Sequence, residues 1–212
     1  MKKQSPLFFL IISIGMVMIV SSCKKDEEED DNSDSKITID SDWQVKYTLD
    51  GVTYNYKEGD WGTDFISGSY SRDESWVPAP DTSSVSWGSG LFSWDGVSFI
   101  DIDRGTLKYV GSFPDEDQFK SFFAPGNYPF APDGGNGMWL RWYDDNGDMW
   151  TTYYGSGDQS GSSIKIDEIA EETGIQGYAI KVKLSFNCKV YDENGNSKTL
   201  TNGIYVGKFL HY

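Results

Sequence analysis

The sequence has few of the residues on which most catalytic and metal sites depend. Its 212 residues include one histidine, His211, and two cysteines, Cys23 and Cys188, and they contain no GxSxG, HExxH or CxxC motif. His211 is the penultimate residue, where chain ends usually fray. A catalytic triad or a structural zinc site would therefore lack its parts. We expect a protein without catalytic activity and without a cofactor.

Basic residues are also scarce. Lys and Arg number 18 against 33 Asp and Glu, which gives a formal charge of −15. Residues 41–212 alone hold 13 basic and 25 acidic residues, a charge of −12. Because nucleic-acid-binding proteins gain most of their affinity by neutralising phosphates with Lys and Arg, this balance excludes a nucleic-acid partner. Aromatic residues are plentiful, at 16% of the chain, and supply apolar area for one sizeable core.

The chain has no apolar run long enough to span a membrane. Residues 7–20 are apolar for 14 residues, or ~21 Å as a helix against the ~30 Å of a bilayer core. Lys2 and Lys3 precede this run, so residues 1–22 read as a signal peptide. The run ends in Val-Ser-Ser before Cys23, which resembles the lipobox of bacterial lipoproteins. That resemblance implies cleavage before Cys23, acylation of its thiol and a lipid anchor; the alternative is an ordinary secretory signal.

Residues 23–40, the lipidated cysteine and an acidic segment that starts at Lys24, precede the single folded domain, residues 41–212. The first 12 residues of the acidic segment, KKDEEEDDNSDS, contain no apolar side chain and cannot pack, so we expect a disordered tether. A plain spacer would look the same. Lys24, Lys25, Asp26 and Glu27 nevertheless resemble the signal by which Bacteroidota-type lipoproteins reach the cell surface. The resemblance implies an outer-membrane protein that faces outward.

One segment shows a clear strand pattern. From Tyr178 to Val190 the even positions are apolar and the odd positions are mostly polar. This period of two predicts a long strand with one buried face. Cys188 falls on that face, where we expect it to be an inert apolar residue.

Short turns separate several further strands. Asp-Gly at residues 50–51 and 95–96 lies between apolar runs and predicts two tight hairpins. Two near-identical stretches, YDDNGD at residues 143–148 and YDENGN at residues 191–196, place Asn-Gly between strands in the same way. Many short strands joined by such turns predict an all-β fold.

A single helix is expected. Pro114 and three acidic residues precede the stripe Phe119, Phe122 and Phe123, and Pro125-Gly126 ends it. Residues 58–90 and 126–137 are rich in Gly, Ser, Asp and Pro and are expected to be long loops. We predict an antiparallel β-sandwich of jelly-roll or immunoglobulin-like kind with one short helix, and a lipocalin-like β-barrel is the alternative.

The acidic turns raise the question of metal binding. Aligning Gly147 with the glycine of an EF-hand loop puts Trp142 at the first ligand position, so the loop does not qualify. A looser calcium cage of Asp144, Asn146 and Asp148 is a weak candidate. We favour a turn that uses Asp, Asn and Gly for its backbone conformation.

Carboxylate pairs are the remaining route to catalysis, as in glycosidases. With 33 acidic residues, chance pairs are plentiful and the sequence does not single one out. Asp101 and Asp103 share a strand face beside Arg104. We interpret them as solvated charges at a strand edge.

Ligand binding is the function class that the sequence favours. Trp61, Trp76 and Trp87 lie in Gly/Ser/Asp-rich stretches, where a ring with polar neighbours suits stacking on sugars. The alternative for each is a loop anchor packed on the core. A different function is adhesion or assembly, as an accessory subunit of a surface complex, with the long strand at residues 178–190 adding to a partner sheet.

The domain also resembles small Bacteroidota-type surface lipoproteins of no characterised activity. The resemblance rests on five stretches, which are Phe122-Phe123, GNYPF at residues 126–130, YDDNGDMW at residues 143–150, DQSGSSIKI at residues 158–166 and FNCKVYDENGNSKTLTNG at residues 186–203. These are mostly turn and core residues, so they carry no ligand site. The resemblance implies glycan capture, with a polysaccharide or another surface protein as partner.

Overall fold

The computed structural model describes residues 36–59, 66–92, 98–132, 135–144 and 146–212. The segment Ile37–Tyr212 forms one compact unit. Several predictions fall outside the described residues, and these concern Cys23, the export residues Lys24, Lys25, Asp26 and Glu27, Trp61, and the Asp-Gly turn at residues 95–96.

The described residues contain eleven strands and one helix. In chain order these are β1 (Gln44–Leu49), β2 (Val52–Lys57), β3 (Ile66–Ser75), β4 (Ser83–Phe92), β5 (Ser98–Tyr109), α1 (Glu116–Phe122), β6 (Gly126–Tyr128), β7 (Gly137–Tyr143), β8 (Met149–Thr151), β9 (Ser163–Gly174), β10 (Gly177–Tyr191) and β11 (Ser197–Leu210). Among these residues, no helix has the length and apolar character needed to cross a membrane.

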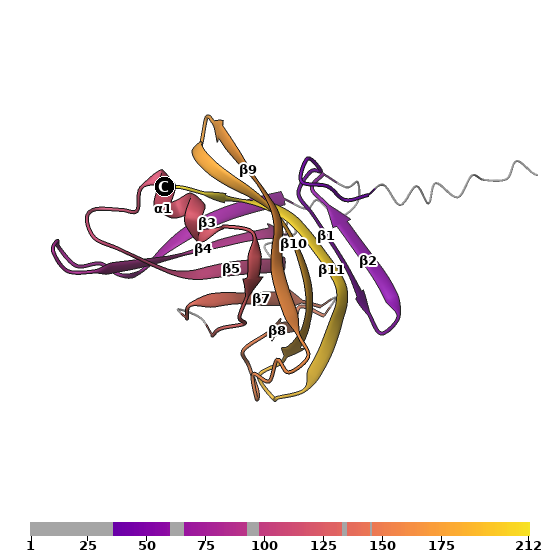
Figure 1. Cartoon of the computed structure of the whole chain (residues 1–212). Coiled ribbons are helices and arrows are strands. Elements are labelled where there is room, and N and C mark those ends of the chain that lie inside the picture. The colour runs from indigo at the N-terminus through magenta and orange to yellow at the C-terminus, as the bar shows by residue number, and fades with distance from the viewer. Residues whose placement is uncertain (1–35, 60–65, 93–97, 133–134, 145) are drawn as a thin grey trace, which may run out of the picture. The chain divides into compact units, whose positions relative to one another are not determined.

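The strands pair antiparallel and form a β-sandwich, as predicted. Their order is β2-β1-β11-β10-β8-β7-β5-β4-β3, with β9 and then β6 added beside β10. One residue pair, Tyr191 with Thr151, joins β10 to β8, so the sheet divides there into two halves. Figure 1 shows β3, β4 and β5 running across β10 and β11 at a steep angle. The described strands run from β2 to β3 without closing, so the alternative of a lipocalin-like barrel is wrong.

The predicted turns build the hairpins. Asp50 and Gly51 both have positive φ, 51° and 81°, and they pair Leu49 with Val52 across a two-residue turn. The two near-identical stretches join β7 to β8 and β10 to β11. In each turn, Oδ1 of the first aspartate, Asp144 or Asp192, accepts backbone N–H groups from the residues two and four positions later. The sequence likeness therefore reflects one turn geometry used twice.

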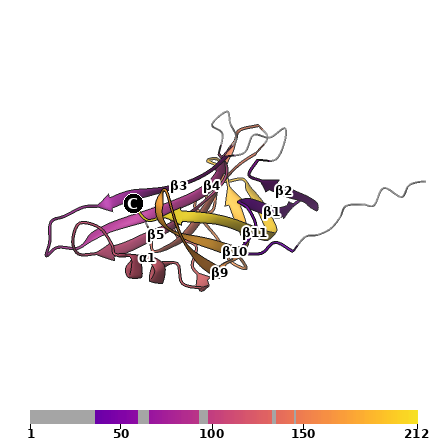
Figure 2. The same cartoon turned by 90° about the horizontal axis from the view of Figure 1, so that it is seen from above.

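The predicted helix is present and closes one side of the core. Asp115 caps α1 by accepting from the Gln118 backbone, while the Gln118 side chain accepts from the Asp115 N–H. Phe119, Phe122 and Phe123 are buried against Trp87. Both views place α1 on the far side of the sandwich from β1 and β2 (Figure 1, Figure 2).

The long predicted strand is β10, and its apolar face is buried. Cys188 is 1% exposed, as expected, and burial raises the pKa of its thiol. The strand pairs with β9 on one side and β11 on the other. It is therefore not a free edge, and the expectation that it adds to a partner sheet is wrong.

The expectation of a loop over residues 58–90 is also wrong, because β3 and β4 occupy most of this segment. Val85, Trp87, Ser89 and Leu91 face the core in alternation with small residues on the other face. Those small residues are needed, since a Cβ at Gly88 would overlap the phenol of Tyr70. The second predicted loop, residues 126–137, contains the short strand β6 and a bridge between Phe130 and Met138.

Candidate ligand-binding site

The three tryptophans proposed for stacking do not share one environment. Trp61 lies outside the described residues. Trp76 follows β3 and is 61% exposed, so its ring is accessible as expected. Trp87 is 0% exposed in the middle of β4, packed on the phenylalanines of α1. Its selection as a loop residue was wrong because the alternation of β4 carries it into the core.

A better aromatic surface lies on β1 and β2. Tyr47 lies opposite Tyr54, and Tyr56 follows two residues later on the same face. The Tyr47 and Tyr54 rings are 5.4 Å apart and 18° from parallel, and the Tyr54 and Tyr56 rings are 6.2 Å apart and 13° from parallel. Tyr47 is buried, whereas Tyr54 and Tyr56 are half-buried. The three rings form a nearly parallel set with its outer part open to solvent.

The facing wall comes from the other half of the sandwich and from β11. Trp142 on β7 donates its indole N–H to the Tyr47 hydroxyl at 3.0 Å. Trp142 and Trp150 are neighbours, with ring centroids 6.2 Å apart. The Lys198 ammonium lies over both rings, 4.8 Å and 4.0 Å from their centroids. This cation–π arrangement places the ammonium against apolar walls.

Asp144 holds Lys198 in this position. Its Oδ2 accepts from Lys198 Nζ at 3.0 Å and from the Trp150 indole N–H at 3.1 Å. Its Oδ1 accepts the backbone N–H groups of Asn146 and Asp148. Burial raises the pKa of Asp144, but the hydrogen bonds from Lys198 and these N–H groups outweigh burial. The pKa of Asp144 therefore lies below its ordinary value. All four donors occupy the carboxylate, so the geometry argues against the weak calcium cage of Asp144, Asn146 and Asp148.

Together these residues line a cleft of about 180 Å³, which we call the aromatic cleft. Its lining residues are Tyr47, Leu49, Tyr54, Tyr56, Trp142, Asp144, Asn146 and Lys198. Larger hollows of about 410 and 380 Å³ lie beside the end of β11. Neither has a pair of stacked rings among its described lining residues, so the aromatic cleft is the stronger candidate site.

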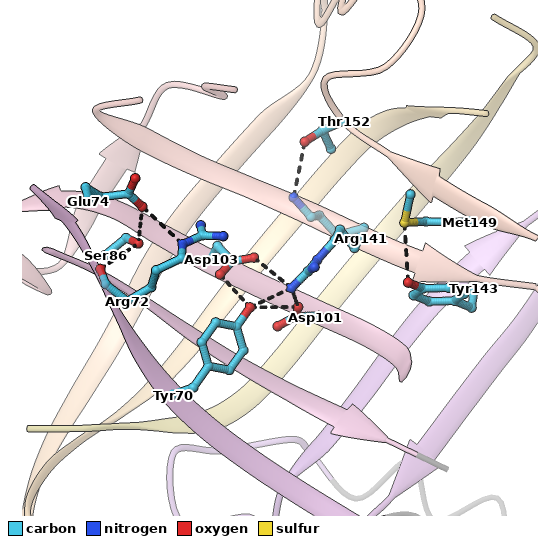
Figure 3. A network of polar contacts seen from close by, with 11 residues as sticks. Tyr70, Arg72, Glu74, Ser86, Asp101, Asp103, Arg141, Tyr143, Met149 and Thr152 are labelled. Carbon is cyan, nitrogen blue, oxygen red and sulfur yellow. Dashed lines mark hydrogen bonds and ion pairs between the residues drawn. The ribbon is translucent and has the colours of Figure 1, made fainter. Parts of the chain in front are cut away.

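A second polar cluster lies on the outer face of β3, β4, β5 and β7 (Figure 3). Asp101 and Asp103 on β5 are each 1% exposed, so the interpretation of them as solvated charges is wrong. Tyr70 on β3 and Arg141 on β7 reach them from either side. We call these four residues the carboxylate cluster.

The carboxylate cluster brings two buried acids to one phenol. The Tyr70 hydroxyl oxygen lies 3.0 Å from Asp101 Oδ2 and 2.7 Å from Asp103 Oδ1, and it accepts from Arg141 Nη2 at 2.6 Å. The single phenolic proton is thus shared between two carboxyl groups. Burial, followed by the charge of Asp101, raises the pKa of Asp103 to about 8. This shift favours the protonated form of Asp103 at neutral pH.

This carboxylate pair is not arranged as an open glycosidase site. Both side chains are closed off from solvent, and Tyr70 and Arg141 occupy their inward oxygens. Oδ1 of Asp101 and Oδ2 of Asp103 are buried without a hydrogen-bond partner. The two carboxyl groups are thus enclosed, whereas Arg141 keeps 31% of its side chain exposed.

His211, set aside as a residue of a frayed end, is held in place. Its backbone N–H donates to Tyr178 at 2.9 Å, and its ring nitrogen Nε2 lies 2.8 Å from the Pro114 carbonyl. The ring also packs against Phe113 and Phe119. The expectation of a frayed tail is wrong because these contacts anchor the end of the chain.

Sequence reasoning missed the tyrosines of the aromatic cleft. The signal was present, because the two-residue turn at Asp50-Gly51 fixes the register that sets Tyr47 opposite Tyr54. The prediction rested on tryptophans in Gly/Ser/Asp-rich stretches, whereas the rings of the cleft include tyrosines of a hairpin. The contact of Lys198 with Trp142 and Trp150 is tertiary, and no local sequence pattern predicts it.

Comparison with known proteins adds no family to this description. No family model matches the chain, and no curated protein or solved structure is significantly similar to it. The geometry of the aromatic cleft is therefore the basis on which a function is assigned.

Proposed function

We propose that the domain binds glycans in the aromatic cleft. The observation that carries this proposal is the set of three nearly parallel tyrosine rings, two of them half-buried, beside a polar wall. A pyranose ring has flat apolar faces and a rim of hydroxyl groups. Aromatic rings with one side wet suit its faces, and a few fixed polar groups suit its rim.

The polar groups of the cleft match the rim of a sugar. The Asn146 side-chain amide and the Tyr54 hydroxyl make no hydrogen bond within the part of the chain that the structure describes. An amide and a phenol can each donate and accept, which is what a hydroxyl group requires of a partner. A sugar stacked on Tyr54 would meet both groups.

The placement of the domain on the cell surface is part of the proposal. It depends on the lipobox at Cys23 and on the acidic residues that follow it. With Cys23→Ala, the protein should leave the membrane fraction. Replacing residues 24–31 by neutral residues should keep the protein membrane-bound but hide it from protease added to intact cells, and unchanged exposure would remove the export hypothesis.

Glycan retention by variants tests the binding site. Affinity electrophoresis through gels that contain a polysaccharide should show retention of the full chain and loss of retention for Tyr54→Ala. Tyr54→Phe keeps the ring and should retain most of the binding. Tyr212→Ala, which removes a 53% exposed tyrosine outside the cleft, is the matched control. Equal retention of Tyr54→Ala and Tyr212→Ala would contradict the assignment.

Trp76 supports a second candidate, adhesion to a protein partner. Its ring is 61% exposed, and exposed tryptophans are enriched at protein interfaces. It lies at the opposite end of β5 from the cleft, because Ile100 pairs with Trp142 whereas Lys108 pairs with Ser84, next to the end of β3. Loss of glycan retention in Trp76→Ala but not in Tyr54→Ala would move the site to this end.

A further inference from the structure

The charges around the aromatic cleft identify the class of its ligand. Lys198 is the one cation among the described residues that line the cleft, and Asp144 is the one acid. Their side chains meet at 3.0 Å. The cleft therefore has no net charge of its own.

The two charges of this pair are matched to each other. Asp144 already accepts four hydrogen bonds, through both of its oxygens. The Lys198 ammonium contacts Asp144 and the two indole rings, and 29% of its side chain is exposed. A ligand anion that approached Lys198 would also approach Asp144, 3.0 Å away, whose negative charge offsets the attraction.

The other lysines of the hairpin do not add positive charge to the cleft. Lys46 precedes Tyr47 and Lys57 follows Tyr56 on β1 and β2. Because successive side chains of a strand point to opposite faces, both lysines belong to the face away from the tyrosines.

The surface next to the cleft is acidic. The turn that supplies Asn146 continues into a hollow of about 270 Å³ whose lining includes Asp148, Asp192 and Glu193. The folded domain, residues 41–212, has a formal charge of −12. An anionic polysaccharide would approach this surface against electrostatic repulsion.

We infer that the ligand of the aromatic cleft is an uncharged glycan, a neutral hexose or pentose polymer, and that the Lys198–Asp144 pair excludes uronic-acid and other anionic polysaccharides. The inference rests on the proposed glycan-binding function. In it, Tyr54 and Tyr56 supply contact with the sugar faces, and the closed ion pair supplies selectivity. Freeing the charge of Lys198 from Asp144 should change which polysaccharides bind.

The test compares neutral and anionic polysaccharides of similar length. The probes are soluble glucan, xylan and galactomannan on one side and polygalacturonate and alginate on the other, each at low and at physiological salt. The protein should bind at least one neutral polymer and neither anionic one. Its affinity should change less than about twofold with salt, because no charge on the ligand is there to be screened.

Two variants open the ion pair. Asp144→Asn keeps an Oδ1 acceptor for the turn but frees the charge of Lys198, so it should acquire salt-sensitive binding of polygalacturonate. Lys198→Met keeps an apolar cover on the indoles and should leave anionic polymers unbound. Lys120→Met, at a lysine of α1 paired with Glu171, is the matched control and should bind like the unaltered chain. Thermal unfolding of each variant confirms that the fold is intact.

The possible results separate the two proposals. Salt-sensitive binding of polygalacturonate or alginate by the unaltered chain, lost in Lys198→Met, would overturn the inference and leave glycan binding in place. Binding of neutral polymers that survives Tyr54→Ala would overturn the assignment to this cleft. Retention of no polysaccharide of either kind would remove the proposed function, and the inference with it.

Discussion

The aromatic cleft and the carboxylate cluster differ in how their acidic and basic side chains are paired. In the cleft, one acid and one base form a pair, and every Asp144 oxygen has partners. In the cluster, two acids share Arg141 and Tyr70, and two carboxyl oxygens are buried without a hydrogen-bond partner. The difference indicates that the cleft is a balanced surface that can receive a ligand, whereas the cluster is tied to the stability of the fold.

Removal of the shared base should have the largest effect. Arg141→Met leaves Asp101 and Asp103 buried without their counter-charge, and breaking a buried pair in this way costs roughly 3 to 5 kcal/mol. Urea unfolding measures the loss. Lys120→Met, which breaks an exposed pair with Glu171, should change the unfolding midpoint very little. Equal effects of the two variants would show that the cluster is not buried as described.

The packing of Tyr70 on β4 gives the next largest effect. Gly88→Ala places a methyl group where the Tyr70 phenol lies, and overpacking of this kind costs about 1 to 3 kcal/mol. Gly174→Ala is the matched control, because nothing lies within 4 Å of its added carbon and its φ is ordinary. Gly88→Ala should also weaken the contacts of Tyr70 with the two aspartates. If both variants unfold at the same urea concentration, Tyr70 does not rest on Gly88.

The proton held by the cluster predicts a pH dependence of stability. In the folded protein the pKa of Asp103 is raised, chiefly by burial and then by Asp101, to about 8, while the unfolded value is about 4. Between these values the folded state keeps a proton that the unfolded state has lost. Stability should therefore fall as pH rises from about 5 to 8, by up to about 1.4 kcal/mol per pH unit for this group.

Asp103→Asn removes that titration, because an amide keeps the hydrogen-bonding shape without a proton to lose. Urea unfolding at pH 5, 6.5 and 8 should give a flatter profile for the variant than for the unaltered chain. Parallel profiles would mean that both aspartates are ionised throughout this range.

The smallest effect on stability is expected in the aromatic cleft. Tyr54 is half-buried, so Tyr54→Ala should cost about 1 kcal/mol from lost apolar contact. Tyr47 is 1% exposed, and Tyr47→Ala should cost about 3 to 5 kcal/mol, as for other buried aromatic rings. Thermal unfolding of the two variants distinguishes a ring that is available to a ligand, Tyr54, from a ring that is packed in the core, Tyr47. A large loss of stability in Tyr54→Ala would place its ring in the core.

Local patterns were sufficient for much of the fold. The alternation around Cys188 predicted β10, Asp50-Gly51 predicted the first hairpin, and Phe119 with Phe122 and Phe123 predicted α1. Each of these signals is local, since it depends on strand period, turn conformation or helix period. The large number of short strands and turns predicted the antiparallel β-sandwich.

The missed strands and the candidate site depend on contacts between distant residues. The Gly/Ser/Asp/Pro-rich composition of residues 58–90 predicts a loop, although Val85, Trp87 and Leu91 alternate on the core face of β4. Tyr70 lies so close to residue 88 that a side chain there would overlap it, so glycine is needed. The sequence alone does not reveal this contact. The local sequence likewise predicts that Asp101 and Asp103 are solvated, because their burial depends on Tyr70 of β3 and Arg141 of β7.

Chemical-shift mapping tests the central assignment most directly. Isotope-labelled protein is titrated with a soluble oligosaccharide cut from a neutral polysaccharide that the protein retains. The account predicts that amide signals of β2, of Asn146 and of Lys198 shift in a saturable manner, while those of Tyr70 and Arg141 stay unchanged. Shifts centred on Tyr70 and Arg141, or on Trp76, would contradict the aromatic cleft as the binding site.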